Sequence, residues 1–228
     1  MPVLAYIVVA LAAYLLGSIP TGFLVAKAKG IDIRSVGSGN IGATNAMRVL
    51  GKSAGIFVLL MDAAKGYVAC YMGIICSGFI LVATHFSVTD SNAAYYDKLF
   101  NEFPFVIVSG IFAVLGHNYT CWLKFKGGKG IATTAGVYVA LQPIALAIAF
   151  VVFILTVLVT RYVSVGSIIA AIALSAAVWI MPHNLLLAIV TTALSALAIY
   201  KHKSNIQRLL AGTENRLGKK TSRSEDAK

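Results

Sequence analysis

The chain has 228 residues, of which 59% are hydrophobic and only 12% are charged. Soluble domains carry about 25% charged residues, so this composition excludes an ordinary soluble protein. The formal net charge is +11, and on an apolar chain such a surplus first indicates basic cytoplasmic loops rather than nucleic-acid binding.

Five charge-free runs are each long enough for a membrane-spanning helix of about 20 residues. The last two runs are too long for one span, and each has an internal break, at Gln142-Pro143 and at residues 181–184. The five runs are residues 2–26, 66–89, 103–123, 131–160 and 162–200.

The basic residues decide whether the short piece before Pro143, residues 131–142, crosses the membrane. If residues 131–160 crossed once, the basic C-terminal tail would lie opposite the basic loops at 27–52 and 124–129. If they cross twice, all three basic segments share the cytoplasmic side, as the Lys and Arg bias requires. We therefore predict that residues 131–160 cross twice.

This count predicts an all-α polytopic integral membrane protein with seven transmembrane helices, its N-terminus outside and its C-terminus cytoplasmic. A single domain is expected over residues 1–218, with an outer loop at 84–102 and a disordered polar tail at 219–228. The expected helices are residues 3–26, 53–83, 103–122, 131–142, 144–160, 164–181 and 185–200.

The first cytoplasmic loop is rich in groups that bind anions. Gly37, Gly39 and Gly42 fit G-x-G-x-x-G, but no βαβ unit surrounds them, so a dinucleotide site is not expected. Glycines still let backbone N–H groups converge on a phosphate, although a flexible turn is the simpler reading. Further donors favour anion binding: Ser38, Asn40, Thr44, Asn45 and then Arg48.

The second loop carries Lys129 between two glycines, Gly128 and Gly130. Lysines at a membrane surface usually contact anionic lipids or fix topology. Flanking glycines let the backbone approach a bound group, and the lysine would then act as a point charge on phosphate. His117, at the start of this region, is interpreted as a helix-end histidine whose hydrogen bonds are satisfied.

Two further polar pairs are expected on the cytoplasmic side, and one charged pair lies within a predicted span. Ser164 and Ser167 face one way at a predicted helix start. His202 and Asn205 have the same spacing in a basic stretch that also fits a juxtamembrane helix. Asp62 and Lys65 are expected to pair, with a structural and a functional role both open.

One motif is rejected. His85 and Asp90 fit H-x-x-x-x-D, the pattern of another acyltransferase class, but they lie on the predicted outer side, away from every anion-binding segment. The three cysteines lie in apolar stretches without CxxC spacing, so neither a disulfide framework nor a zinc site is expected.

Taken together, six segments closely resemble the acyl-phosphate:glycerol-3-phosphate acyltransferase family of bacterial inner membranes, the PlsY type. They match in order over nearly the whole chain. The segments are GSIPTG (17–22), GSGNIGATNAMR (37–48), DAAKG (62–66), GHNYTCWLKFKGGKGIAT (116–133), RYVSVGS (161–167) and KHKSNIQRLLAGTE (201–214).

The resemblance implies acyl transfer from an acyl phosphate to the 1-hydroxyl of sn-glycerol 3-phosphate, giving lysophosphatidic acid and phosphate. The implied glycerol-3-phosphate site is Ser38, Arg48, Lys129, His202 and Asn205. Lys129, His202, Ser38 and Asn205 are also the expected catalytic residues. The implied acyl-phosphate site is Gly39, Asn40, Gly42, Thr44, Asn45, Gly128, Ser164 and Ser167.

No metal or other cofactor is expected. Because an acyl phosphate is already activated, no covalent enzyme intermediate is expected either. The general base is left open between His202 and a substrate phosphate oxygen. The expected location is the bacterial inner membrane with a cytoplasm-facing site, and the partners are both substrates, membrane lipid and a soluble enzyme that makes acyl phosphate. The alternatives are a transporter of phosphorylated solutes and a structural, lipid-scaffolding membrane protein.

Overall fold

A computed structural model describes residues 2–84, 104–181 and 184–218, and these ranges contain helices and no strand. The predicted outer loop beyond residue 84, the rejected His85–Asp90 motif and the predicted tail at 219–228 lie outside the described residues.

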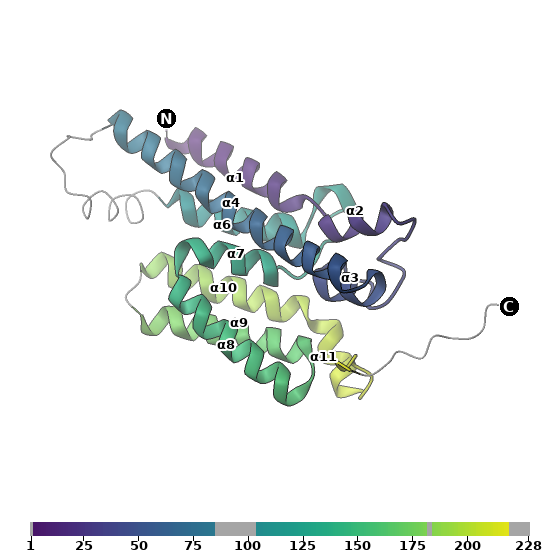
Figure 1. Cartoon of the computed structure of the whole chain (residues 1–228). Helices are drawn as coiled ribbons and strands as arrows, with labels where there is room; N and C mark the ends of the chain where they lie inside the picture. Colours follow the sequence, from purple (N-terminus) through teal and green to yellow (C-terminus); the bar gives the residue numbers. More distant parts are fainter. Residues whose placement is uncertain (1, 85–103, 182–183, 219–228) are drawn as a thin grey trace.

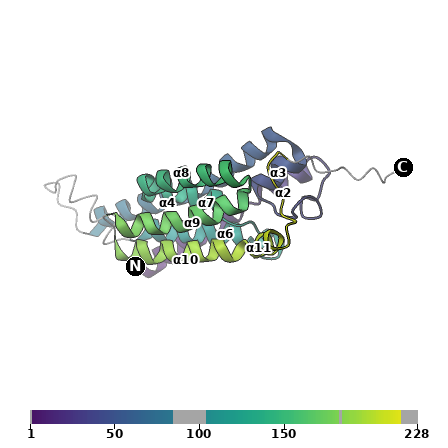
Figure 2. The same ribbon diagram turned by 90° about the horizontal axis from the view of Figure 1, so that it is seen from below.

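The helices form two groups that lie side by side. One group contains α1, α4 and α6, with α7 packed mainly against α4, and the other contains α8, α9 and α10 (Figure 1), which are adjacent in Figure 2. The elements are α1 (Pro2–Ser18), α2 (Thr21–Lys27), α3 (Ala43–Leu50), α4 (Lys52–Thr84), α6 (Phe105–Asn118), the 3-10 turn η1 (Cys121–Leu123), α7 (Ile131–Leu141), α8 (Pro143–Thr160), α9 (Val163–Ile180), α10 (Leu185–Lys201) and α11 (Lys203–Leu210).

Five stretches are long and apolar enough to cross a membrane, with α1 and α2 together counted as one, and α10 with α11, bent by 51°, gives a sixth if that pair is one span. The predicted span at 131–142 folds as α7, whose 11 residues reach only about 16 Å at 1.5 Å per residue. The described residues therefore give five to six spans by length and composition, and they do not confirm the predicted count of seven.

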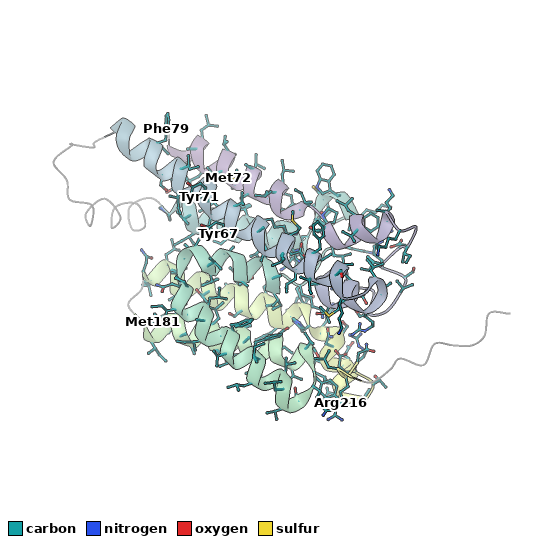
Figure 3. The ribbon with its side chains drawn as sticks, in the orientation of Figure 1. Tyr67, Tyr71, Met72, Phe79, Met181 and Arg216 are labelled. Atoms are coloured by element: carbon teal, nitrogen blue, oxygen red, sulfur yellow. The ribbon has the colours of Figure 1, made fainter. Side chains whose placement is uncertain are left out.

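The outer surface of the bundle is apolar. Helix α8 has a mean hydropathy of 2.8, yet only 11% of it is buried. Tyr71 and Phe79 lie along α4 and are more than half exposed (Figure 3). A helix that is this hydrophobic on its exposed side is stable only against lipid.

Both predicted breaks are confirmed, because α7 ends at Leu141 before Pro143, and α9 and α10 are separate helices. The predicted span at 3–26 is confirmed as one apolar stretch, Val3–Lys27, but its helix is interrupted between α1 and α2 at Pro20, which was not predicted. Proline lacks an N–H and keeps the preceding residue out of the helical conformation. Apolar residues on both sides of Pro20 hid this break.

The predicted loop at 27–52 also contains a helix that was not expected, α3. It is bounded by Gly42 in extended conformation and by Gly51 at φ 97°. A residue with a β-carbon is strained at such a φ, so Gly51 suits the turn from α3 into α4.

Small residues set the distance between α4 and α7. A β-carbon on Gly66 would lie 2.2 Å from the carbonyl oxygen of Thr133, and one on Gly136 would lie 1.8 Å from that of Ala63. Glycine lets helices in membranes approach this closely. As a result, the start of α7 lies beside the polar stretch of α4.

That polar stretch is the buried pair Asp62 and Lys65, with Lys65 Nζ 2.8 Å from Asp62 Oδ1. Lys65 Nζ also donates to the carbonyl oxygen of Ile19, 3.0 Å away, which the break at Pro20 releases from helical bonding. The predicted pairing is confirmed, and its structural role is to close the broken end of α1.

Replacing Lys65 by methionine should lower the stability of the protein by about 3 kcal/mol, because it leaves Asp62 as an unpaired buried charge. The midpoint of thermal unfolding in detergent micelles measures this loss. Lys52→Met, at an exposed position, serves as the control. An unfolding midpoint for Lys65→Met equal to that of the control would contradict the role of the pair.

Candidate anion-binding site

A cavity of about 350 Å³ lies at the end of the bundle where α2, α3 and α11 gather (Figure 1). Its wall combines the loop before α3, the starts of α7 and α9, the junction of α10 and α11, and residues 214–218. Arg216, on that last segment, is labelled in Figure 3. Segments more than 150 residues apart in sequence therefore meet here.

Helix N-termini converge on this cavity. The first residues of α3, α7 and α9, namely Ala43, Ile131 and Val163, line it, as does His202 at the start of α11. None of these four starts is capped by a side chain. Free N–H groups and the positive ends of helix dipoles favour a bound anion.

Asn45 shapes the first loop. Its Oδ1 accepts a hydrogen bond from Ser38 N (2.8 Å), and its Nδ2 donates to the carbonyl oxygens of Val36 (3.1 Å) and Asn40 (2.9 Å). Its amide therefore holds the loop closed. Ser38, Asn40 and Thr44 remain on the cavity wall.

Lys129 projects from the second loop toward α11, where its Nζ donates to Asn205 Oδ1. Burial lowers the pKa of Lys129 to about 8; Glu214 opposes this shift, whereas Arg208 and Arg48 add to it. Near neutral pH the lysine is still charged, and the group to which it donates, the side-chain amide of Asn205, is neutral. It is ready to bind an anion.

Glu214 joins three groups at the cavity edge. Its carboxylate accepts hydrogen bonds from Ser164 Oγ (2.9 Å), Asn205 Nδ2 (2.7 Å) and Arg208 Nε (2.7 Å). Burial raises the pKa of Glu214, but these bonds outweigh burial and hold the pKa below its usual value. An ionised carboxylate therefore fixes the segment after α11 against α9.

His202 lies at the bend after α10. Its Nδ1 is 2.8 Å from the carbonyl oxygen of Ala198, so Nδ1 carries the proton and Nε2 is left as a hydrogen-bond acceptor. Burial, with Lys129 nearby, lowers the pKa of His202 to about 4. The ring is therefore neutral at physiological pH.

The structure brings most of the predicted site residues together. Two do not line the cavity: Gly39 forms a turn at φ 71°, and Gly128 packs against His117. The predicted residues on the cavity wall are Ser38, Asn40, Gly42, Thr44, Asn45, Arg48, Lys129, Ser164, Ser167, His202 and Asn205.

Sequence reasoning did not place Asp62, His117 or Glu214 in the site, yet all three line the cavity. His117 was expected to have satisfied hydrogen bonds, but within the described part of the chain its Nδ1 has no hydrogen-bond partner. The signal for Asp62 was a charge inside a span. Over the same described ranges, no three His, Cys, Asp or Glu side chains come together as a metal site.

Comparison with known proteins gives consistent matches over nearly the whole chain. The family model described as Glycerol-3-phosphate acyltransferase matches residues 7–212. The glycerol-3-phosphate acyltransferase of Geotalea daltonii is 42% identical over 209 residues, covering 92% of this chain and 96% of its own. That of Geobacter sulfurreducens is 45% identical over 204 residues, covering 90% and 93%.

Solved structures agree. The chain is similar to PlsY (YgiH), an integral membrane glycerol 3-phosphate acyltransferase, in its glycerol 3-phosphate form, with a TM-score of 0.80 and 37% identity over 93% of this chain and 96% of that one. The lysophosphatidic acid form matches with a TM-score of 0.77 and 36% identity over 93% and 95%.

Sulfate binding to the cavity should weaken as the pH rises through about 8, because Lys129 loses its proton there and sulfate itself does not titrate. Calorimetry from pH 6 to 10 measures the affinity. Lys129→Arg, which stays charged, should keep its affinity to higher pH. An affinity that is flat across this range in the unmodified protein would exclude Lys129 from the anion site.

Proposed function

This chain belongs to the glycerol-3-phosphate acyltransferase family, and we propose that it transfers an acyl group from acyl phosphate to the 1-hydroxyl of sn-glycerol 3-phosphate. The observation that carries this proposal is the convergence of Lys129, Arg48 and four uncapped helix starts on one cavity. Both substrates and one product bear phosphate. Membership of an acyltransferase family argues against the alternative that this chain is a transporter.

Two phosphate positions fit the wall of the cavity. Glycerol 3-phosphate binds on the side of Lys129 and Asn205, which already touch, together with Ser38, Arg48 and His202. The phosphate of the donor binds at the starts of α3 and α9, with Ser164 and Ser167. Gly39 and Gly128 contribute by shaping the loops, and Asn45 by holding the first loop closed.

The chemistry needs no covalent enzyme intermediate, because the acyl phosphate is already activated. The 1-oxygen of glycerol 3-phosphate forms a bond to the carbonyl carbon, and the bond from that carbon to the phosphate oxygen breaks. Lys129 or the backbone N–H groups of a helix start stabilise the negative charge on the carbonyl oxygen. Alignment of the two substrates lowers the entropic part of the activation barrier.

The proton of the attacking hydroxyl goes to a phosphate oxygen or to His202. His202 presents Nε2 as an acceptor, so it can receive a hydrogen bond from a glycerol hydroxyl. With its pKa lowered to about 4, it is a weak base at neutral pH. These properties favour a substrate phosphate as the base and His202 as a binding group.

The orientation of the protein in the membrane is inferred from the end of the bundle that holds the cavity. Basic residues lie at the end of α2 (Lys27), at the start of α4 (Lys52) and in the loop before α7 (Lys124 and Lys126), and such residues favour the cytoplasmic side. Helix α7 starts at the cavity and α8 returns to it. This fits a bacterial inner-membrane protein of one domain with seven crossings, served by a soluble enzyme that makes the acyl phosphate.

The purified protein should form lysophosphatidic acid from glycerol 3-phosphate and acyl phosphate, but not from acyl-CoA or acyl carrier protein, because only in acyl phosphate is the leaving group a phosphate bonded directly to the acyl carbonyl carbon, where the second phosphate position would hold it. Product and released inorganic phosphate, measured separately for each donor, check this. Activity with acyl-CoA alone would refute the proposed donor.

Lys129→Ala should lower kcat/KM about a hundredfold, as loss of a charged donor to the reacting groups does. His202→Ala should mainly raise the KM for glycerol 3-phosphate. Steady-state kinetics at pH 7 separate the two effects. Full activity of Lys129→Ala would refute the site, whereas a large loss of kcat in His202→Ala with unchanged KM would make His202 the base.

A further inference from the structure

We propose that His117, held in place by Asp62, positions Lys129 for glycerol 3-phosphate by supporting the backbone of Gly128. This inference rests on the proposed function, because it takes Lys129 as a substrate ligand. His117 and Asp62 are positioning residues here, acting through the loop that carries the lysine.

The loop before Lys129 lies directly on the end of α6. Gly128 N donates to the carbonyl oxygen of His117 (2.9 Å), and Gly127 N donates to that of Asn118 (3.2 Å). A β-carbon on Gly128 would lie 2.1 Å from His117 Nε2. Gly128 has no positive φ, so this position excludes a side chain for lack of space and not for backbone conformation.

The opposite edge of the His117 ring faces α4. His117 Nδ1 lies 3.6 Å from Asp62 Oδ1, which is a close polar contact but too long for a hydrogen bond. Lys65 Nζ donates to the same oxygen and to the carbonyl of Ile19. All three side chains are at least 94% buried, so the carboxylate cannot move away from the ring.

The ring therefore sits between a fixed carboxylate and the glycine loop. One residue beyond Gly128, Lys129 extends to Asn205, and Gly130 at φ 83° turns the chain into α7. A displacement of about 1 Å in a binding group can cost about a hundredfold in rate. The contact between His117 and Gly128 thus sets where the lysine charge lies.

A double-mutant cycle tests this contact. His117→Ala should raise the KM for glycerol 3-phosphate about tenfold and change kcat less than about threefold. This is the effect expected when a residue that orients a substrate-binding side chain is lost. Gly128→Ala should raise the KM at least as much, because its methyl group collides with the ring. In the double variant the methyl group fills the space left by the ring, so its KM should be lower than that of Gly128→Ala.

A second pair of variants tests the carboxylate. Asp62→Asn keeps an oxygen for Lys65 and should raise the KM less than His117→Ala does. Combined with His117→Ala it should add nothing further, because Asp62 acts through the ring. The matched control is Ile107→Ala, because Ile107 is buried on α6, the helix of His117, near the end away from the loop that carries Lys129. This variant should lose stability while its KM stays unchanged.

Losses that multiply in either cycle would overturn the proposal. So would a KM change in the Ile107→Ala control as large as that in His117→Ala. Calorimetric affinity for glycerol 3-phosphate, measured on the same variants without a donor, repeats both cycles. If the unmodified protein rejects acyl phosphate, the proposed donor fails, yet these affinities still decide the positioning role.

Discussion

The cavity depends on the hydrogen bonds that the ionised carboxylate of Glu214 accepts from α9 and α11. Lys129, Arg48 and Arg208 lie near one another in a partly buried region, where like charges repel strongly. Glu214 bonds to Arg208 and Asn205 on α11 and to Ser164 on α9. It thereby balances charge and joins the last helices of the chain into one wall.

At the cavity end of the bundle, the other main contributors to the wall are the backbone N–H groups of helix starts. Loops in a soluble enzyme often supply anion-binding N–H groups, whereas here the starts of α3, α7 and α9 line the cavity. This solution suits a membrane protein, because a helix needs no hydrogen-bond partners along its apolar length. Only its first turn has free N–H donors, and for α3, α7 and α9 that turn lies at the cavity.

Hydropathy and basic residues predicted the long helices, and Pro143 marked its break correctly, because these signals are local. The break at Pro20 was not predicted, because apolar residues flank it and the donor to the carbonyl oxygen of Ile19, Lys65, is 46 residues away from Ile19 in sequence. Glu214 and His117 were missed for the same reason. Their partners, Ser164 and Gly128, are near them only in three dimensions, and no sequence period links them.

Leu59 lines the cavity, yet its side chain is also 45% exposed on the outer face of α4. The cavity wall is therefore continuous with the surface that faces lipid, and Met47 and Phe153 extend the same apolar side. Moving a chain of about 15 methylene groups through water would cost about 12 kcal/mol, at about 0.8 kcal/mol per group. Under the proposed function, a product with one acyl chain would avoid this cost by passing along Leu59 into the lipid leaflet, while phosphate would leave toward water.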